Sequence, residues 1–454
     1  MTNFHYIRTS GGDAGGIADL HVLIWSWPCA RFHAGMPFAR TLSKMQRRRG
    51  VALGAKSSST SGAPPRILIV GAGCTGSLVA KHLRANFVSL DECPDVTVWE
   101  WARGPAGRMS TFWKEMDGVR HIADVGAQVM STRDNADIEW LKDQGAIEAS
   151  GLATTRERKP EMRHFWVQGG LTRILHAQLE AGAPTELVFD QKVTGIHRDG
   201  EQFVVEARGN GRGSRGVSAR FDAVVVAGTA SDTLRIKGMT DVMKAKHVQA
   251  LKHVRYDHRL AAAFLCRPDI VNNLDDMFGE SRAEISFDGV DDVLELVAWQ
   301  DRKHRNHSKC TVMVVHTTIP FAKKNLADAK IKREPPIKLA TPSIVNAIAS
   351  RLGLDSAEMQ NVILDSKIVH WRQCQMKRST PGGEPCLVST LPIPKSPLLV
   401  VCGDFCTESN YGGCSQSAQA ASKSLMEWYK ARNRLSSSVR HRLARKAPRA
   451  REPT

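Results

Sequence analysis

The chain has 454 residues, of which 42% are apolar and 24% are charged, and its formal net charge is +17. These values are ordinary for a globular enzyme with a large core and two or three domains. No apolar run reaches the roughly 18–20 residues that a membrane span needs. The ten cysteines show no pairing rhythm, which argues against a disulfide scaffold.

The positive charge is concentrated at the two ends of the chain. Residues 1–64 carry eight basic and two acidic side chains, and residues 431–454 carry eight basic and one acidic, which leaves +4 for residues 65–430. Such tails can contact nucleic acid, a membrane surface or an import receptor, but we predict solvated, disordered extensions. No aromatic residue follows Lys430, so specific nucleic-acid binding by base stacking is not expected there.

Residues 1–64 are rich in Arg and Ser and poor in acids, and this composition resembles an organelle transit peptide. An over-long gene model, with Met36 or Met45 as the true start, explains the segment equally well. The cysteine usage favours a reducing compartment, so we expect a cytoplasmic or organellar protein rather than a secreted one. No metal site is expected, because the sequence has no Cys-x-x-Cys and no His follows Cys414 at finger spacing.

The strongest local signal begins near Arg66. An apolar run at 67–70 predicts a buried parallel strand, and Gly71, Gly73 and Gly76 follow before an apolar pattern at helical spacing. In such a turn the first glycine allows the tight bend, the second lets the backbone approach a diphosphate, and the third permits close helix–strand packing. A second strand at 96–100 ends in Glu100, which is placed to bind ribose hydroxyls. The unit predicts dinucleotide binding.

The stretch from Arg103 to Thr111 extends this prediction. It follows the acidic residue, so Gly107 can bring backbone close to the cofactor. Arg108 can offer its guanidinium fork to a diphosphate.

The remaining elements are predicted from apolar periodicity and turn signals. We expect helices at 135–144 and 172–181, strands at 186–189, 192–196, 202–207 and 221–227, and a strand at 312–315 within a mixed region from about 238 to 394. A strand at 397–402, a loop at 403–413 and a helix at 415–429 complete the chain. Because the first and last segments both suit one nucleotide-binding sheet, a second domain is predicted to be inserted between them.

Several of these segments resemble a known family. VGAGCTGSL, GRMST and DVGAQ, within 66–128, resemble the FAD-binding start of the flavin amine oxidase superfamily. Three later segments narrow the resemblance to the renalase family: Val315–Phe321 (VHTTIPF), His370–Gln373 (HWRQ) and Cys402–Gly413 (CGDFCTESNYGG). The likeness spans about 66–430 and is patchy between 235 and 310. Ala106 stands where the family usually has a second glycine, which makes Gly107 a less secure contact.

The resemblance implies an α/β fold: an FAD-binding Rossmann-like domain of the glutathione-reductase and amine-oxidase type, with an inserted α+β substrate domain. The expected segments are an N-terminal extension (1–64), FAD-binding segments (65–140, 167–237 and 395–430), substrate-domain segments (141–166 and 238–394) and a basic disordered tail (431–454). FAD is expected to be non-covalent, because the Cys motif for covalent attachment is lacking.

The resemblance also implies positions for the cofactor contacts. Asp404 is expected to accept a hydrogen bond from a flavin hydroxyl, Val193 to hold adenine through its backbone, and Gln128 to lie beside the isoalloxazine. The helix after Gly413 is expected to point its positive end at the pyrimidine ring. The expected cofactor-binding residues are Gly71, Gly73, Thr75, Gly76, Glu100, Trp101, Gly107, Arg108, Met109, Gly126, Ala127, Gln128, Val193, Gly403, Asp404 and Gly413.

On the substrate side the candidates are His316, Trp371 and Arg372. The resemblance implies an oxidase that takes hydride from a dihydronicotinamide nucleotide, including non-standard NAD(P)H isomers, and passes electrons to O₂ to give H₂O₂. His316 follows an apolar strand and can reach a domain interface. Trp371 can pack over a planar ring, and Arg372 can bind a carboxamide or a phosphate. A monomer or weak oligomer is expected.

Two other functions remain open at this point. A monoamine or polyamine oxidase usually frames its amine with two aromatic rings, whereas this chain has four tyrosines, of which Tyr411 alone lies in a motif expected near the flavin. The second alternative is a non-catalytic protein that binds FAD and acts through its basic tails.

Overall fold

The computed structural model describes residues 64–89, 93–105, 107–149, 161–209, 211, 216–280, 282–304, 310–389 and 396–446, with side chains as far as Asn433. All of them belong to the second of the chain's two units, Met45–Thr454. The expectations for the N-terminal extension, for Ala106 and for residues 447–454 lie outside the described residues.

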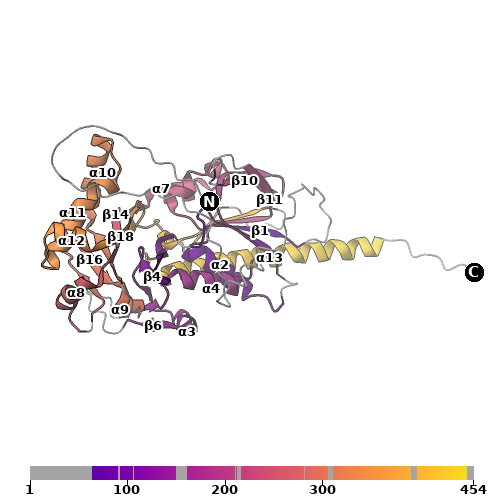
Figure 1. The fold of residues 1–454 in the computed structure, drawn as a ribbon. Coiled ribbons are helices and arrows are strands. Elements are labelled where there is room, and N and C mark those ends of the chain that lie inside the picture. Colours follow the sequence, from indigo (N-terminus) through magenta and orange to yellow (C-terminus); the bar gives the residue numbers. More distant parts are fainter. Residues whose placement is uncertain are drawn as a thin grey trace, which may run out of the picture. The chain divides into compact units, whose positions relative to one another are not determined.

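A six-stranded sheet carries the glycine-rich segment (Figure 1). Its order is β20-β21-β12-β1-β2-β8, and all neighbours are parallel except β20 and β21. The central strands have apolar side chains on both faces, as expected for strands covered from both sides. The strands are β1 (Arg66–Val70), β2 (Asp95–Trp99), β8 (Glu186–Val188), β12 (Ala223–Val226), β20 (Leu387–Val388) and β21 (Leu398–Val401).

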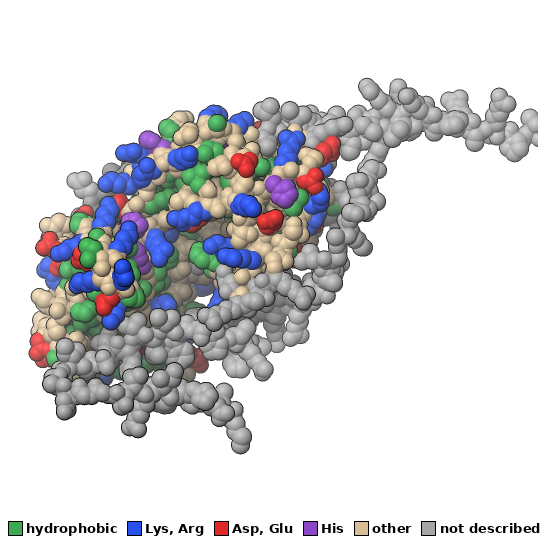
Figure 2. Space-filling model, turned by 90° about the horizontal axis from the view of Figure 1, so that it is seen from above, with side chains coloured by type: hydrophobic (Ala, Val, Ile, Leu, Met, Phe, Trp, Pro, Cys, Tyr) green, Lys and Arg blue, Asp and Glu red, His purple; other side chains and the backbone are tan. Residues whose placement is uncertain are grey.

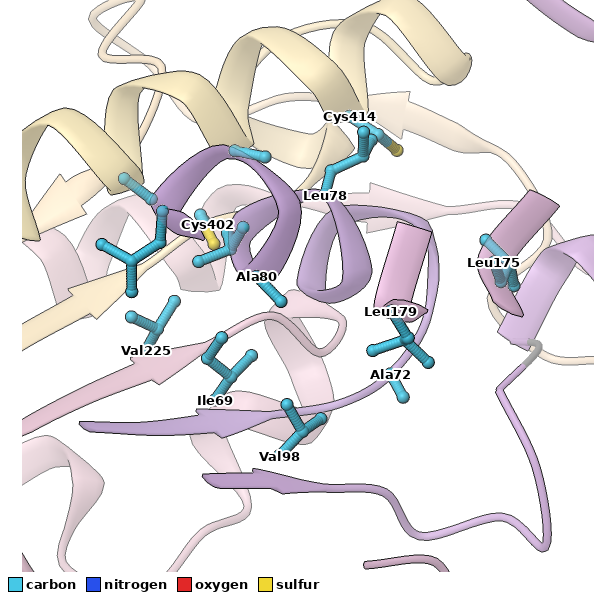
Figure 3. Close-up of a cluster of buried hydrophobic side chains, with 14 of the residues drawn as sticks. Ile69, Ala72, Leu78, Ala80, Val98, Leu175, Leu179, Val225, Cys402 and Cys414 are labelled. Carbon is cyan, nitrogen blue, oxygen red and sulfur yellow. The ribbon is translucent and has the colours of Figure 1, made fainter. Parts of the chain in front are cut away.

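Three helices cover one face of this sheet: α2 (Cys74–Arg84), α4 (Thr172–Gly182) and α13 (Tyr411–Lys446). Their apolar side chains interlock with those of the strands in one continuous core. Figure 3 shows Ile69, Val98 and Val225 of the sheet beneath Leu78 and Ala80 of α2. The strand–turn–helix–strand unit expected at 66–100 is therefore present, and residues from both ends of the chain share its core.

The other face of the sheet packs against a three-stranded antiparallel sheet and short helices. Val193, Phe203 and Leu68 are buried together in this second core. Its elements are β9 (Gln191–Asp199), β10 (Gln202–Gly209), β11 (Gly216–Phe221), α5 (Ala230–Leu234), α6 (Met239–Val242) and α7 (Ala245–His253).

A five-stranded antiparallel sheet, in the order β15-β16-β17-β14-β18, is built from the region between β12 and β21. The strands are β14 (Arg259–Cys266), β15 (Glu284–Ser286), β16 (Leu294–Trp299), β17 (Thr311–Thr317) and β18 (Ile363–Trp371). The helices are η2 (Pro268–Ile270), α8 (Val271–Phe278), α9 (Gln300–His304), α10 (Ile319–Lys332), α11 (Pro336–Arg351) and α12 (Ser356–Val362). The inserted α+β region predicted from the sequence is therefore present.

Smaller elements lie between these sheets in the sequence. They are η1 (Gly107–Met109), the hairpin of β3 (Thr111–Met116) and β4 (Val119–Asp124), the sheet β5-β7-β6 (Met130–Thr132, Arg163–Val167, Ala146–Glu148), α3 (Asn135–Asp143), the pair β13 (Arg255–Tyr256) and β19 (Met376–Arg378), and η3 (Asp404–Cys406). None of the described helices is both long and apolar enough to cross a membrane.

Three details differ from the sequence-based expectations. Helix α13 begins at Tyr411 rather than Ser415, and it continues to Lys446, so residues 431–446 are helical rather than a disordered tail. The Arg, Leu, Ala and Lys of this stretch are strong helix formers, which explains the continuation. Phe165 of β7 packs in the core under α2, although 141–166 was expected in the substrate domain. Met239 and Val248 pack in the core of the first sheet, although the boundary was expected at 237/238.

Candidate functional site

The glycine-rich turn between β1 and α2 leaves an open approach to the start of the helix. Gly71 has φ +103°, a conformation that L side chains rarely adopt. A Cβ on Gly76 would lie 1.9 Å from the Gly71 carbonyl oxygen, so only glycine allows this close packing. A Cβ on Gly73, by contrast, would meet nothing within 4 Å. The turn therefore has free space beside Gly73, where a diphosphate would lie.

The amino end of α2 is suited to an anion. No side chain caps it, and no acidic residue lies in its first turn. Thr75 in that turn is 6% exposed. Free N–H groups and the helix dipole attract negative charge at such an end.

Glu100 lies directly beyond β2, and main-chain groups hold both of its carboxylate oxygens. Oε2 accepts from the Ala72 N–H at 2.7 Å, and Oε1 accepts from the Ala102 N–H at 2.7 Å. Burial raises the pKa of Glu100, and the backbone hydrogen bonds offset only part of this effect. A carboxylate oxygen accepts more than one hydrogen bond, so the group can also bind ribose hydroxyls.

The expected adenine contact lies beside this carboxylate. The Gln191 N–H donates to the Glu100 carbonyl at 2.8 Å, which brings the start of β9 to the end of β2. Val193, two residues farther along β9, is 9% exposed. Trp101 is 56% exposed, with the Lys192 ammonium 4.6 Å from its ring centre.

Arg108 and Asp404 form a bidentate ion pair. Arg108 Nη1 donates to Asp404 Oδ2 and Nη2 donates to Oδ1, both at 2.7 Å, and Asp404 is 2% exposed. Burial acts to lower the pKa of Arg108, but the Asp404 carboxylate outweighs it and raises that pKa. The sequence assigned these two groups to separate cofactor contacts. They instead form one unit, which the Ser409 hydroxyl extends by donating to Asp404 Oδ2 at 3.0 Å.

The loop that carries Arg108 lies against the glycine-rich turn. A Cβ on Gly107 would come 4.0 Å from the Gly73 Cα. Met109 is buried in the core, and the Ala127 N–H donates to the Arg108 carbonyl at 2.8 Å. The GRMST and DVGAQ segments are therefore joined, with Gly126 packed directly on the Arg108 carbonyl.

Gly403 and Gly413 lie on either side of η3. Gly403 follows β21, and its N–H donates to the Ser417 hydroxyl at 2.9 Å. Gly413 was expected to precede the last helix, but it lies inside the first turn of α13, where its N–H donates to the Asn410 side chain at 2.7 Å. The helix begins early because Asn410 supplies a side-chain cap.

A buried polar cluster holds Gln128. Lys303 Nζ donates to the Gln128 carbonyl at 2.8 Å and to Oε1 at 3.0 Å, and Gln300 Nε2 also donates to Oε1 at 3.0 Å. The Lys303 ammonium is fully buried, and carboxylate oxygens of Asp124 and Glu284 lie 3.8 and 3.4 Å from it. The cluster fixes which end of the Gln128 amide donates.

Two of the three candidate substrate residues reach this loop. The Gln128 Nε2 amide nitrogen lies 3.5 Å from His316 Nε2 on β17, and Trp371 Nε1 donates to the Val125 carbonyl at 2.8 Å. Because Lys303 and Gln300 donate to Gln128 Oε1, Nε2 is the donor end of this amide. It donates to the Asp124 carbonyl, and the Gly126 carbonyl lies 3.3 Å from it. Arg372, just beyond β18, is exposed.

Sequence reasoning did not find Lys303, Gln300, Glu284 or Asp124 as site residues. The described residues contain no group of three His, Cys, Asp or Glu side chains that could hold a metal ion. The sequence gives little signal for the cluster, because Lys303 lies in a short polar helix, α9, after the apolar strand β16, and such lysines are usually solvated.

Comparisons with known proteins show what this chain is similar to. A family model described as an NAD(P)-binding Rossmann-like domain matches residues 69–142. Renalase from Mus musculus is 24% identical over 385 residues, covering 80% of this chain and 99% of the mouse protein.

Two solved structures share the fold. A putative protoporphyrinogen oxidase from Exiguobacterium sp. 255-15 has a TM-score of 0.55 at 10% identity, over 80% of this chain and 99% of that one. Putrescine oxidase bound to putrescine has a TM-score of 0.53 at 13% identity, with the same coverage. The predicted fold class is confirmed, and the chain is related to oxidoreductases.

Proposed function

We propose that the chain is an FAD-dependent oxidase of renalase type, which takes hydride from a dihydronicotinamide nucleotide and passes the electrons to O₂. The observation that carries this proposal is the meeting of two predicted sites. Residues 126–128 are expected beside the flavin, and His316 and Trp371 beside the substrate. In the loop 125–128, Gln128 contacts His316 and the Val125 carbonyl accepts from Trp371. These contacts join residues from distant parts of the sequence.

The described residues fit FAD. The space beside Gly73, the uncapped start of α2 and the two main-chain contacts of Glu100 suit a diphosphate flanked by a ribose. When bound, FAD would supply the hydride acceptor and the group that O₂ reoxidises, with release of H₂O₂. The chain itself would hold the cofactor, orient the substrate against it and tune the reactivity of the flavin.

On the substrate side the proposed roles follow from the contacts. The hydrogen bond from Trp371 to the Val125 carbonyl fixes the indole beside the loop 125–128, where it can pack on a planar nicotinamide ring. The contact between His316 Nε2 and Gln128 holds the imidazole beside the loop 125–128, where we assign it to orient the carboxamide of the substrate. The exposed Arg372 is suited to a phosphate.

Oxygen uptake and peroxide release with a panel of substrates test the proposal. The panel contains β-NADH, its 2- and 6-dihydro isomers, putrescine and several monoamines. We expect turnover with at least one dihydronicotinamide and little with any amine. Rapid turnover of amines alone would replace the proposal with an amine oxidase. A flavoprotein that no reductant turns over would favour a binding protein.

A variant of the contact on which the proposal depends sharpens the test. Gln128→Leu removes the donor that faces His316 and keeps a side chain of similar length. We expect a fall of about 10²-fold in kcat, since a misplaced reacting geometry has effects of this order. The bound FAD content should be retained. Unchanged kcat in this variant would show that the contact has no part in turnover.

A further inference from the structure

A strongly cationic pocket of about 400 Å³ lies where β13 pairs with β19, and α10 contributes to its wall. Its lining residues are Arg255, Tyr256, Asp257, Lys323, Lys377 and Arg378. Four of the six side chains are cationic and one is a carboxylate. The Lys323 ammonium lies 3.0 Å from Asp257 Oδ1 and so neutralises that carboxylate.

The other three cations leave the pocket with an excess positive charge. Arg255 uses Nη1 to donate to the Val254 carbonyl at 2.9 Å, which anchors its guanidinium at the rim. Within the described part of the chain, neither Lys377 nor Arg378 has an ion-pair partner. Like charges gathered in a concavity repel one another, so this arrangement is stabilised by an anion. Figure 2, seen from above, shows many Lys and Arg side chains on the face where Figure 1 places α7 and α10.

The pocket lies close to the proposed substrate residues along two paired segments. Trp371 is paired with Arg259, and Arg378 is paired with Arg255. The four residue-to-residue steps from Arg259 to Arg255 span at most roughly 13 Å. A dinucleotide with its nicotinamide ring near Trp371 would extend its phosphates toward this pocket.

Further contacts connect the pocket to both sides of the site. The Arg108 guanidinium lies 5.8 Å from the ring centre of Tyr256, which lines the pocket. Burial lowers the pKa of His258, and the charges of Lys323 and Arg372 add to this effect. The nearby Asp257 carboxylate opposes this effect.

We propose that this pocket binds the phosphate groups of the dihydronicotinamide nucleotide substrate. This inference rests on the proposed function and specifies that the enzyme binds its substrate through the phosphate groups. The guanidinium groups of Arg255 and Arg378 and the ammonium of Lys377 suit phosphate oxygens, since Arg binds them through paired N–H groups and Lys as a point charge. The same charges repel a diamine or polyamine, which disfavours that class of substrate.

Isothermal titration of the FAD-loaded protein with NADP⁺, which is not oxidised further, tests the pocket without turnover. The test variant is Lys377→Gln with Arg378→Gln, and the control is Lys332→Gln, an exposed cation on α10 that does not line the pocket. We expect the double variant to bind NADP⁺ at least about tenfold more weakly, as the loss of charge-assisted hydrogen bonds requires. Binding to the control should change little.

Three outcomes separate the explanations. Equal NADP⁺ affinity in the double variant and the control would overturn the proposal. Loss of bound FAD in the double variant would also overturn it, because the pocket would then serve the cofactor's own phosphates. If NADP⁺ binding depends on the pocket but no dihydronicotinamide is oxidised by the wild type, the pocket stands and the proposed oxidase function fails.

Discussion

The two sides of the candidate site are built by different means. On the cofactor side, the site is formed mainly by the backbone. Gly71, Gly73 and Gly76 shape the turn, and backbone N–H groups hold the Glu100 carboxylate. Toward the substrate side, where the flavin-side residue Gln128 meets His316, side chains from separate elements hold one another, with Lys303 and Gln128 at the centre. A main-chain site depends on the absence of side-chain atoms, whereas a side-chain site depends on the charges and hydrogen bonds of the groups that are present.

The largest expected effect is on the cofactor side. Gly76→Ala puts a Cβ 1.9 Å from the Gly71 carbonyl oxygen, and such overlap with backbone destabilises the unit by more than about 3 kcal/mol. We expect protein without FAD, or no folded protein. Gly73→Ala is the matched control, since its Cβ meets no protein atom within 4 Å. It should fold normally by circular dichroism and bind FAD more weakly, because the methyl group takes diphosphate space. Full FAD content in Gly76→Ala would contradict the packing argument.

The next effect is on the substrate side. Lys303→Met leaves the buried carboxylates of Asp124 and Glu284 without their ammonium, which costs about 3–5 kcal/mol of unfolding free energy. Lys114→Met is the control, because Lys114 and its partner Asp365 are both partly exposed to solvent, and exposed pairs contribute about 1 kcal/mol or less. Urea denaturation measures both. Equal losses in the two variants would show that the buried cluster is not held by its charges.

The pH dependence of stability should have opposite signs on the two sides. Burial acts to raise the pKa of Asp124, but the His304 hydrogen bond and the Lys303 charge outweigh it, so this pKa lies below its ordinary value of 3.8. Its stabilising contribution is full above that value and is lost as the pH falls through the lower, folded-state pKa.

For Glu100 burial prevails, and the pKa lies above its ordinary value of 4.5. Its contribution is full below that value and is lost as the pH rises through the higher pKa. Comparing unfolding free energies of wild type, Asp124→Asn and Glu100→Gln across the acidic range measures both slopes. Slopes of the same sign for the two residues would refute the assignment.

The smallest expected effect on stability is at the exposed Arg372. Arg372→Gln should change the free energy of unfolding by about 0.5 kcal/mol or less, as is usual for surface positions. We expect KM for the nucleotide to rise about tenfold with kcat preserved, because a phosphate contact acts equally on bound substrate and transition state. Lys367→Gln, another exposed cation on β18, serves as the control. A fall in kcat with KM unchanged would assign Arg372 a different role.

The same contrast explains what could be predicted from the sequence. The turn at 71–76 and the acidic end of β2 lie within a short segment, so their spacing alone indicated a strand, a helix and a dinucleotide site. Gln128 and Lys303 are 175 positions apart, and no local pattern relates them. The ion pair of Arg108 with Asp404 was missed for the same reason, since 296 positions separate the two residues.

Helix ends were also harder to predict than helix positions. The start of α13 depends on a side-chain cap by Asn410. The helix continues to Lys446 because residues 431–446 contain strong helix formers, although their high positive charge had suggested a disordered tail. His316 and Trp371 were proposed from the family resemblance. Their strands β17 and β18 lie on either side of β14, and only this pairing brings them into one sheet.

The most direct test of the central claim is the cofactor content of the purified full-length protein. We predict a yellow protein whose visible flavin band belongs to FAD, with one FAD per chain released by acid and none left attached. A colourless, folded protein that takes up no added FAD while its glycine-rich turn is unaltered would contradict the account.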